Sequence, residues 1–243
     1  MPGKIHIGTS GWNYKHWKGT FYPEDLSQKE WLDFYKDRLD TVEINNSFYR
    51  LPEKKTFIKW KNSVSGNFIF SAKASRYITH MKKLKGPPEE SLKNMLDNFE
   101  GLGDHLKPIL FQLPPNWKFN EERLKSFIDI LPDNFLYTFE LRDERWINDT
   151  STDILKDRNI AFCIYELAGY QSPLNITADF VYIRLHGPGK EKYQGKYTKK
   201  QLSGWADHLK DWQANNLDVY LYFDNDEQGF AAQNAMELKE MVG

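Results

Sequence analysis

Charged side chains stand near the carboxyl ends of several short apolar segments of this sequence. One segment reads FVYIRLHG, and Arg184 and His186 interrupt it just before a Gly-Pro-Gly break. Carboxylates beside arginine, lysine and a protonated histidine are the residue types that bind anions and transfer protons. The residues placed in this way are Glu43, Lys73, Glu140, Arg142, Glu166, Arg184, His186 and Asp224.

Two interpretations of this charged set are open. A lattice of salt bridges would satisfy the polarity of a barrel interior without any activity. Burying many ionisable groups together is costly unless they pair, and proteins keep such clusters mostly where binding or chemistry needs them. We therefore favour a functional site. The expected roles are anion binding for Arg184, Arg142 and Lys73, and proton transfer for Glu43 or Glu140 as general acid or base with His186 as partner near neutral pH.

Metal binding is a further interpretation of the same residues. The acids and His186 have the right chemistry, but the sequence contains no HExxH motif and no paired cysteines. The neighbouring lysine and arginines favour an anion over a dication, so we expect no metal and no cofactor. They should also lower the pKa values of both acids, which disfavours a glycosidase-like carboxylate pair.

Alternation of side chains predicts the elements that carry these residues. Successive side chains of a strand point to opposite faces, so Tyr182, Arg184 and His186 share one face of their strand. On each of these strands, the polar side chains lie toward the carboxyl end. The same split places these pairs on polar faces: Glu43 and Asn45, Ser71 and Lys73, Glu140 and Arg142, and Tyr222 and Asp224.

Short apolar runs alternate with amphipathic stretches along the whole chain, which is typical of repeated βα units. An open doubly wound sheet favours strands that are apolar on both faces, whereas a closed barrel has an interior face whose carboxyl-terminal mouth holds the active site. The sequence therefore predicts an α/β fold with a closed eight-stranded parallel TIM-type barrel, as one domain over residues 1–243. The strands are expected to begin near Ile5, Thr41, Phe68, Pro108, Leu136, Ile160, Phe180 and Leu217.

Connections between the strands carry their own signals. Ser27 with Glu30, and Thr198 with Gln201, have the spacing of reciprocal helix caps. The stretch 167–179 contains glycine, proline and asparagine, and is too broken for a covering helix. We expect an irregular crossover after the sixth strand.

Two loops add aromatic and basic residues at the same end of the barrel. The loop 187–200 holds five lysines with Tyr193 and Tyr197, and either binds phosphate or is a solvated lysine-rich loop. The loop 8–23 carries several rings, among them Trp12, which either stack on a ligand or cap the barrel. Neither loop has a phosphate-loop or dinucleotide fingerprint.

The charge and composition of the whole chain limit which partners and which cell compartment we expect for the protein. The 33 lysines and arginines against 34 acids give a formal net charge of -1, which gives no global attraction to nucleic acid. The single Cys163 and the absence of an apolar leader predict a cytoplasmic protein. A mean hydropathy of -0.70 without a long apolar run predicts no membrane partner.

Ordered motifs along the chain resemble the YecE-like family, a domain-of-unknown-function family. They are GTSGW with FYP, VEINNSFYRLP, FSAKAS, LFQLPP, FELRDERW, YIRLHG and YFDND with a later QNA, between Ile5 and about Leu238. The resemblance implies a barrel similar to a TIM barrel and, by fold analogy to barrel endonucleases, nucleic acid as a partner. It implies shared polar positions at Glu43, Asn45, Lys73, His80, Gln112, Glu140, Arg142, Trp146, Arg184, His186 and Asn225.

The sequence departs from the usual family pattern at two places. It has Asp224, Asn225 and Asp226 where relatives commonly read Asn-Asn-Asp, and Glu166 where many have aspartate. We expect an enzyme that binds an anionic substrate, with phosphate-ester or nucleic-acid chemistry as the leading class. The rival hypothesis is a non-catalytic nucleic-acid or ligand-binding protein that uses the two loops.

Overall fold

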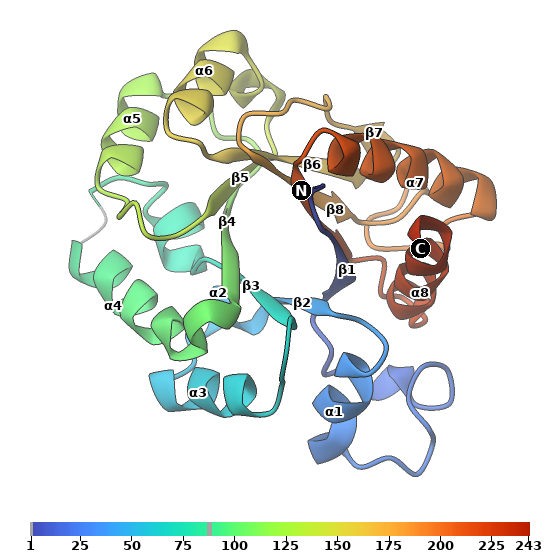
Figure 1. The fold of residues 1–243 in the computed structure, drawn as a ribbon. Helices are drawn as coiled ribbons and strands as arrows, with labels where there is room; N and C mark the ends of the chain where they lie inside the picture. The colour runs from blue at the N-terminus through green and yellow to red at the C-terminus, as the bar shows by residue number, and fades with distance from the viewer. Residues whose placement is uncertain (1, 87–88) are drawn as a thin grey trace.

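Eight parallel strands close into a barrel at the centre of the molecule (Figure 1). The structure is a computed structural model that describes residues 2–86 and 89–243. Each strand pairs with the next one around the ring, and the last pairs with the first. The strands are β1 (Ile5–Ser10), β2 (Thr41–Ile44), β3 (Ile69–Lys73), β4 (Leu106–Leu113), β5 (Tyr137–Leu141), β6 (Ala161–Leu167), β8 (Phe180–Leu185) and β9 (Asp218–Phe223). The predicted closed eight-stranded barrel is confirmed.

Helices lie around the outside of this sheet (Figure 1). Both predicted reciprocal caps are present, Ser27 with Glu30 and Thr198 with Gln201. Among the described residues, no helix is both long and apolar enough to cross a bilayer. The α-helices are α1 (Trp31–Lys36), α2 (Asn46–Tyr49), α3 (Lys54–Asn62), α4 (Glu89–Phe99), α5 (Glu121–Asp129), α6 (Asp149–Asp157), α7 (Lys199–Ala214) and α8 (Phe230–Val242). The shorter helical turns are η1 (Lys15–Trp17), η2 (Gln28–Glu30), η3 (Tyr77–Met81), η4 (Glu100–His105) and η5 (Glu144–Trp146).

The crossover after β6 is irregular, as expected. It contains only the two-residue strand β7 (Tyr170–Gln171), which pairs antiparallel with β6. Side chains of the crossover accept backbone N–H groups of β6: Thr177 Oγ1 from Phe162 at 2.6 Å and Ser172 Oγ from Tyr165 at 2.9 Å. The segment is therefore tied to the sheet without a covering helix.

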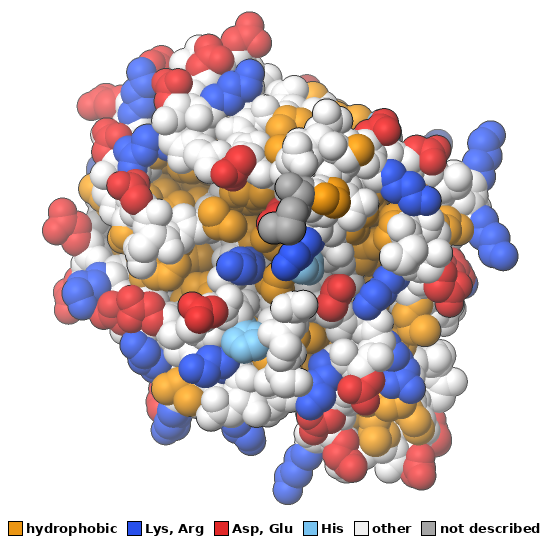
Figure 2. All heavy atoms as spheres, in the orientation of Figure 1, with side chains coloured by type: hydrophobic (Ala, Val, Ile, Leu, Met, Phe, Trp, Pro, Cys, Tyr) orange, Lys and Arg blue, Asp and Glu red, His pale blue; other side chains and the backbone are white. Residues whose placement is uncertain are grey.

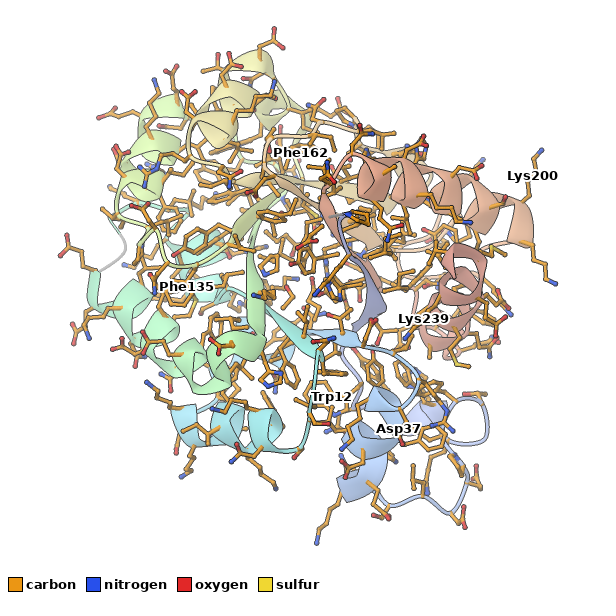
Figure 3. All side chains as sticks on the ribbon, in the orientation of Figure 1. Trp12, Asp37, Phe135, Phe162, Lys200 and Lys239 are labelled. Carbon is orange, nitrogen blue, oxygen red and sulfur yellow. The ribbon has the colours of Figure 1, made fainter. Side chains whose placement is uncertain are left out.

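Alternation divides the core into two parts. Val181, Ile183 and Leu185 belong to the large apolar layer between strands and helices, whereas Tyr182 belongs to a smaller cluster inside the barrel with Cys163. Side chains fill the space between strands and helices in Figure 3. On the face seen in Figure 2, acidic and basic side chains are interspersed around the edge.

Candidate functional site

Ionisable side chains from five of the eight strand ends gather inside the barrel at its carboxyl-terminal end. The parallel pairing brings these ends to one side of the molecule. Glu43, Lys73, Glu140 and Arg184 lie on β2, β3, β5 and β8, and the others directly follow a strand. We call this group the mouth cluster; its members are Glu43, Lys73, Glu140, Arg142, Arg184, His186 and Asp224.

Arg184 lies at the centre of the mouth cluster. Its guanidinium binds Glu43 Oε1 and Glu140 Oε2 at 2.8 Å each and Asp224 Oδ2 at 3.0 Å. The side chain has 0% exposure. Its charge is shared among three carboxylates and no solvent reaches it, so these contacts do not favour direct binding of a substrate anion, which stays a prediction.

The two glutamates are equally enclosed. Glu43 accepts hydrogen bonds from Ser10 Oγ at 2.5 Å and Tyr182 OH at 2.7 Å, in addition to those from Arg184. Glu140 accepts from Gln112 Nε2 at 2.8 Å and from Arg142 Nε. Neither carboxylate is exposed. The main effect of the two carboxylates is to hold the guanidinium groups of Arg184 and Arg142 in place.

His186 is a neutral imidazole in this setting. Its Nε2 accepts hydrogen bonds from Arg142 Nη2 at 2.8 Å and from Arg184 Nη1 at 3.3 Å, and an arginine can only donate. Burial, followed by the charges of Arg142, Arg184 and Lys73, holds the His186 pKa well below its usual value. Nδ1 therefore carries the proton and lies 2.9 Å from Asp224 Oδ2, although this contact is not aligned as a hydrogen bond.

The predicted proton exchange by His186 near neutral pH stays a prediction, and this protonation state does not favour it. Its lone pair is occupied by two guanidinium groups, and the side chain has 0% exposure. The structure instead makes it part of the frame that holds Arg142.

Lys73 differs from the other cations of the mouth cluster because its ammonium nitrogen lacks a carboxylate partner. The carboxylates of the mouth cluster pair with Arg184, and among residues 2–86 and 89–243 none forms an ion pair with Lys73 Nζ. The nitrogen lies 4.3 Å from the centre of the Phe48 ring on α2. Burial, then the charge of Arg184, lowers the Lys73 pKa to about 7. At neutral pH a large share of this amine is therefore uncharged.

Other predicted residues line the open side of the cluster. Asn45 is half-buried, and its Oδ1 has no hydrogen-bond donor among the described residues. Tyr193 is 43% exposed and its ring meets the His186 ring edge-on at 5.4 Å. His80 packs edge-on against Phe48 at 5.0 Å, and burial, followed by the charge of Lys73, lowers its pKa to about 4.

Four predicted site residues lie in the surrounding framework instead. Trp146 is fully buried and donates its Nε1 hydrogen to Trp117 O at 2.5 Å. Trp12 packs against Trp60 of α3. Tyr197 accepts from the Gly187 N–H at 3.1 Å, and Asn225 donates to Gly195 O at 2.9 Å. These contacts order the loop after β8 and the outer layer, and they do not bring the four side chains into the mouth cluster.

Glu166 also lies outside the cluster. Its carboxyl group contacts Trp205 and Tyr197 on the α7 side of the sheet, and burial raises its pKa. Phe162 and Ile164, its neighbours on the same strand face, belong to the outer apolar layer. The lysines of the loop 187–200 do not all point to the mouth cluster either. Lys200, at the start of α7, points away from the barrel (Figure 3).

Sequence reasoning missed polar residues that complete the site. Ser10 and Tyr182 bind Glu43, and Tyr14 OH donates to Ser10 O at 2.6 Å. Asp226 accepts from Trp17 Nε1 at 2.5 Å, and burial raises its pKa to about 6. Alternation placed Tyr182 on the same strand face as Arg184, and only its hydrogen bond to Glu43 needed the structure.

The acids of the mouth cluster surround a guanidinium group. In the described part of the chain, no three His, Cys, Asp or Glu side chains are grouped as ligands for one metal ion. Arg184 occupies the position between Glu43, Glu140 and Asp224 where their negative charges converge.

Comparisons with known proteins agree with this architecture. The UPF0759 protein YunF of Bacillus subtilis (strain 168) is 23% identical over 274 residues, covering 98% of this chain and 94% of the relative. The UPF0759 protein YecE of Escherichia coli (strain K12) is 25% identical over 139 residues, which is 57% of this chain and 48% of the relative. A crystal structure of a DUF72 family protein from Thermotoga maritima MSB8 has a TM-score of 0.88 with 26% identity, covering 98% and 99% of the two chains.

More distant structures share the fold alone. One is a D-psicose 3-epimerase crystallised in the presence of D-fructose, at a TM-score of 0.56 and 11% identity, with 98% of this chain and 95% of that chain covered. The model of the family described as "Protein of unknown function DUF72" matches residues 6–243. The resemblance found in the motifs is thereby confirmed, and this chain belongs to the DUF72 family.

Proposed function

We propose that the mouth cluster is the active site of an enzyme that binds a small anionic substrate, with phosphate esters as the leading class. One observation carries this proposal: the two cations on the open side of the cluster, Arg142 and Lys73, have unused N–H donors. Arg142 uses Nε and Nη2 for Glu140 and His186. Its Nη1 has no partner among the described residues, and its side chain is 8% exposed.

An anion between these two groups would complete their hydrogen bonding. Charge-assisted hydrogen bonds to phosphate or carboxylate oxygens are among the stronger polar contacts in proteins. Glu43 and Glu140 hold Arg184 and Arg142 in place, which reduces the reorganisation needed when the anion arrives.

Proton transfer in this proposal falls to Lys73 and His80 rather than to His186. A pKa of about 7 allows Lys73 to give or take a proton at neutral pH. His80 Nδ1 lies 2.9 Å from Thr79 Oγ1, whose hydroxyl donates to Ser75 O, so His80 Nδ1–H is the donor and Nε2 keeps its lone pair. The His80 imidazole and the Lys73 amine thus pack against the same Phe48 ring.

A titration with inorganic sulfate tests the anion site. We expect saturable binding to the parent protein, followed by calorimetry or protein-detected NMR. Because Arg142 would contribute charged hydrogen bonds, Arg142→Met should weaken the affinity about tenfold or more. Lys192→Met removes an exposed loop lysine and should change the affinity by less than about twofold. No saturable binding to the parent, or equal affinity in the parent and the Arg142 variant, would overturn the proposal.

A nucleic-acid binder is the second candidate, and the exposed loop after β8 favours it. Lys190, Lys192 and Tyr193 are solvent-exposed, and the Tyr193 ring lies against His186 of the mouth cluster. Binding through backbone phosphates weakens steeply with salt. A single-stranded oligonucleotide whose affinity falls steeply with salt and is lost in Lys192→Met would support the binder, whereas equal binding to the two proteins would exclude this loop.

A further inference from the structure

The surroundings of the Lys73 amine differ from those of an ordinary surface lysine. The side chain is 7% exposed and lies against the Phe48 ring. It stands at the end of β3, where backbone pairing and the hydrogen bond from Ser47 Oγ to Lys73 O at 2.7 Å fix its base. The 7% of the side chain that stays exposed is the part that a ligand at the mouth could contact.

Charged and titratable groups from several elements face this amine. Arg184 on β8 and Arg142 after β5 disfavour its protonation, and Glu43 on β2 and Asp224 after β9 favour it. His80 on η3 packs against the same Phe48 ring, and burial, followed by the charge of Lys73, lowers its pKa to about 4. Because the carboxylates are already bound by Arg184, none of them reaches the amine as a partner. The result is a lysine held in place with its nitrogen lone pair available.

We propose that Lys73 is the nucleophile of this site, and that it forms an imine with the carbonyl carbon of a small anionic aldehyde or ketone whose anionic group is held by Arg142. This inference rests on the proposed anion site and narrows its substrate class. A desolvated lysine next to other cations is the arrangement by which enzymes activate an amine for attack on carbonyl carbon.

The chemistry balances without any further reagent. The Nζ lone pair forms a bond to the carbonyl carbon while the C=O π electrons move to oxygen, which takes up a proton and gives a carbinolamine. The nitrogen loses one proton, the hydroxyl group takes up another and leaves as water, and a protonated imine results. The net change consumes one proton from solvent and releases one water molecule.

The neutral fraction of the amine makes this step testable against the other lysines of the same chain. An amine with a pKa of about 7 is roughly half neutral at neutral pH, whereas fewer than about one in a thousand surface lysine amines are. Lower basicity offsets part of this advantage. We therefore expect Lys73 to react about tenfold faster or more than an exposed lysine.

Reductive trapping measures this reactivity site by site. The parent protein is incubated at neutral pH with glyoxylate, an anionic aldehyde, or with glycolaldehyde, a neutral one. Cyanoborohydride then reduces the imine, and peptide mass spectrometry gives the labelling rate at each lysine. The expected result is preferential labelling of Lys73 over Lys192 in the same protein, with glyoxylate favoured over glycolaldehyde. Arg142→Met should remove the preference for glyoxylate and leave the reaction with glycolaldehyde.

The possible failures of the two proposals are separable. If Lys73 is labelled no faster than Lys192 although sulfate binds in an Arg142-dependent manner, the imine inference is overturned and the anion site stands. If Lys73 reacts rapidly but equally with both aldehydes, and sulfate does not bind, the anionic substrate class is overturned together with the proposed function. Because the comparison is made within the parent protein, a variant that fails to fold does not weaken it.

Discussion

A single buried guanidinium organises this site at the scale of the residue. Arg184 binds three carboxylates from three other strands, and all of these contacts lie within the barrel. Buried charges of this kind are tolerated only when they are paired and hydrogen-bonded. The pairing also explains why Lys73 has no carboxylate to neutralise it.

Removing the Arg184 charge should therefore destabilise the protein more than it changes the surface of the site. Arg184→Met leaves three carboxylates close together without a partner, and we expect a loss of about 3–5 kcal/mol in the free energy of unfolding. Urea denaturation measures this loss. Lys125→Met, which breaks an exposed pair with Glu121, is the matched control and should cost less than about 1 kcal/mol. Equal losses in the two variants would show that Arg184 does not brace the barrel.

The lowered pKa of Lys73 predicts how stability depends on pH. The folded pKa is about 7, below the ordinary value of 10.5, so the unfolded chain binds more protons between these two values. Stability from this group must then rise with pH across that window and be smallest below pH 7. The free energy of unfolding of the parent relative to Lys73→Met should rise by at most about 1.4 kcal/mol per pH unit. A flat difference from neutral to alkaline pH would mean that Lys73 titrates normally.

At the scale of the element, the crossover after β6 shows how the barrel closes without a covering helix. Thr177 Oγ1 accepts from the Phe162 N–H and donates to Ile160 O, both at 2.6 Å, and the side chain is 4% exposed. One hydroxyl group therefore satisfies two backbone groups, the N–H of Phe162 in β6 and the carbonyl of Ile160 just before it. The Ser172 hydroxyl group does the same for the Tyr165 N–H.

Replacing this hydroxyl by a methyl group of similar size isolates its contribution. Thr177→Val should lower the free energy of unfolding by about 1–3 kcal/mol, because the Phe162 N–H is left buried without an acceptor. Thr150→Val on the exposed side of α6 changes the same atoms in solvent and should have an effect within about 0.5 kcal/mol. A Thr177 variant as stable as the Thr150 variant would contradict this role; both are compared by urea denaturation.

Sequence alone predicted the elements better than it predicted the states of their side chains. Alternation around Arg184 identified β8 and its interior face, because periodicity of two is a local property. It could not show that His186 is neutral, since this follows from two arginines that barrel closure brings to its Nε2. Glu166 was predicted at the mouth because it is charged. Phe162 and Ile164, on the same face of its strand, are apolar and belong to the outer layer, and they indicate the true position of Glu166.

At the scale of the whole molecule, a nearly neutral chain brings seven ionisable side chains together at one end of the barrel. The formal net charge is -1. A net charge so close to zero supplies no overall field that would steer a large polyanion, so recognition in this account depends on Arg142 and Lys73. The N–H donors of Arg142 and Lys73 at a single opening suit a small anion better than a long polyanion.

The most direct test of the central claim is a crystal structure of the parent protein with inorganic sulfate, grown at mildly acidic pH so that Lys73 is protonated. Sulfate keeps its charge across this pH range, so any effect of pH on binding belongs to the protein. The account predicts one sulfate ion within hydrogen-bond distance of Arg142 Nη1 and Lys73 Nζ, with Arg184 still bound to its three carboxylates. A mouth that contains no sulfate under conditions that place sulfate ions elsewhere on the protein would contradict it.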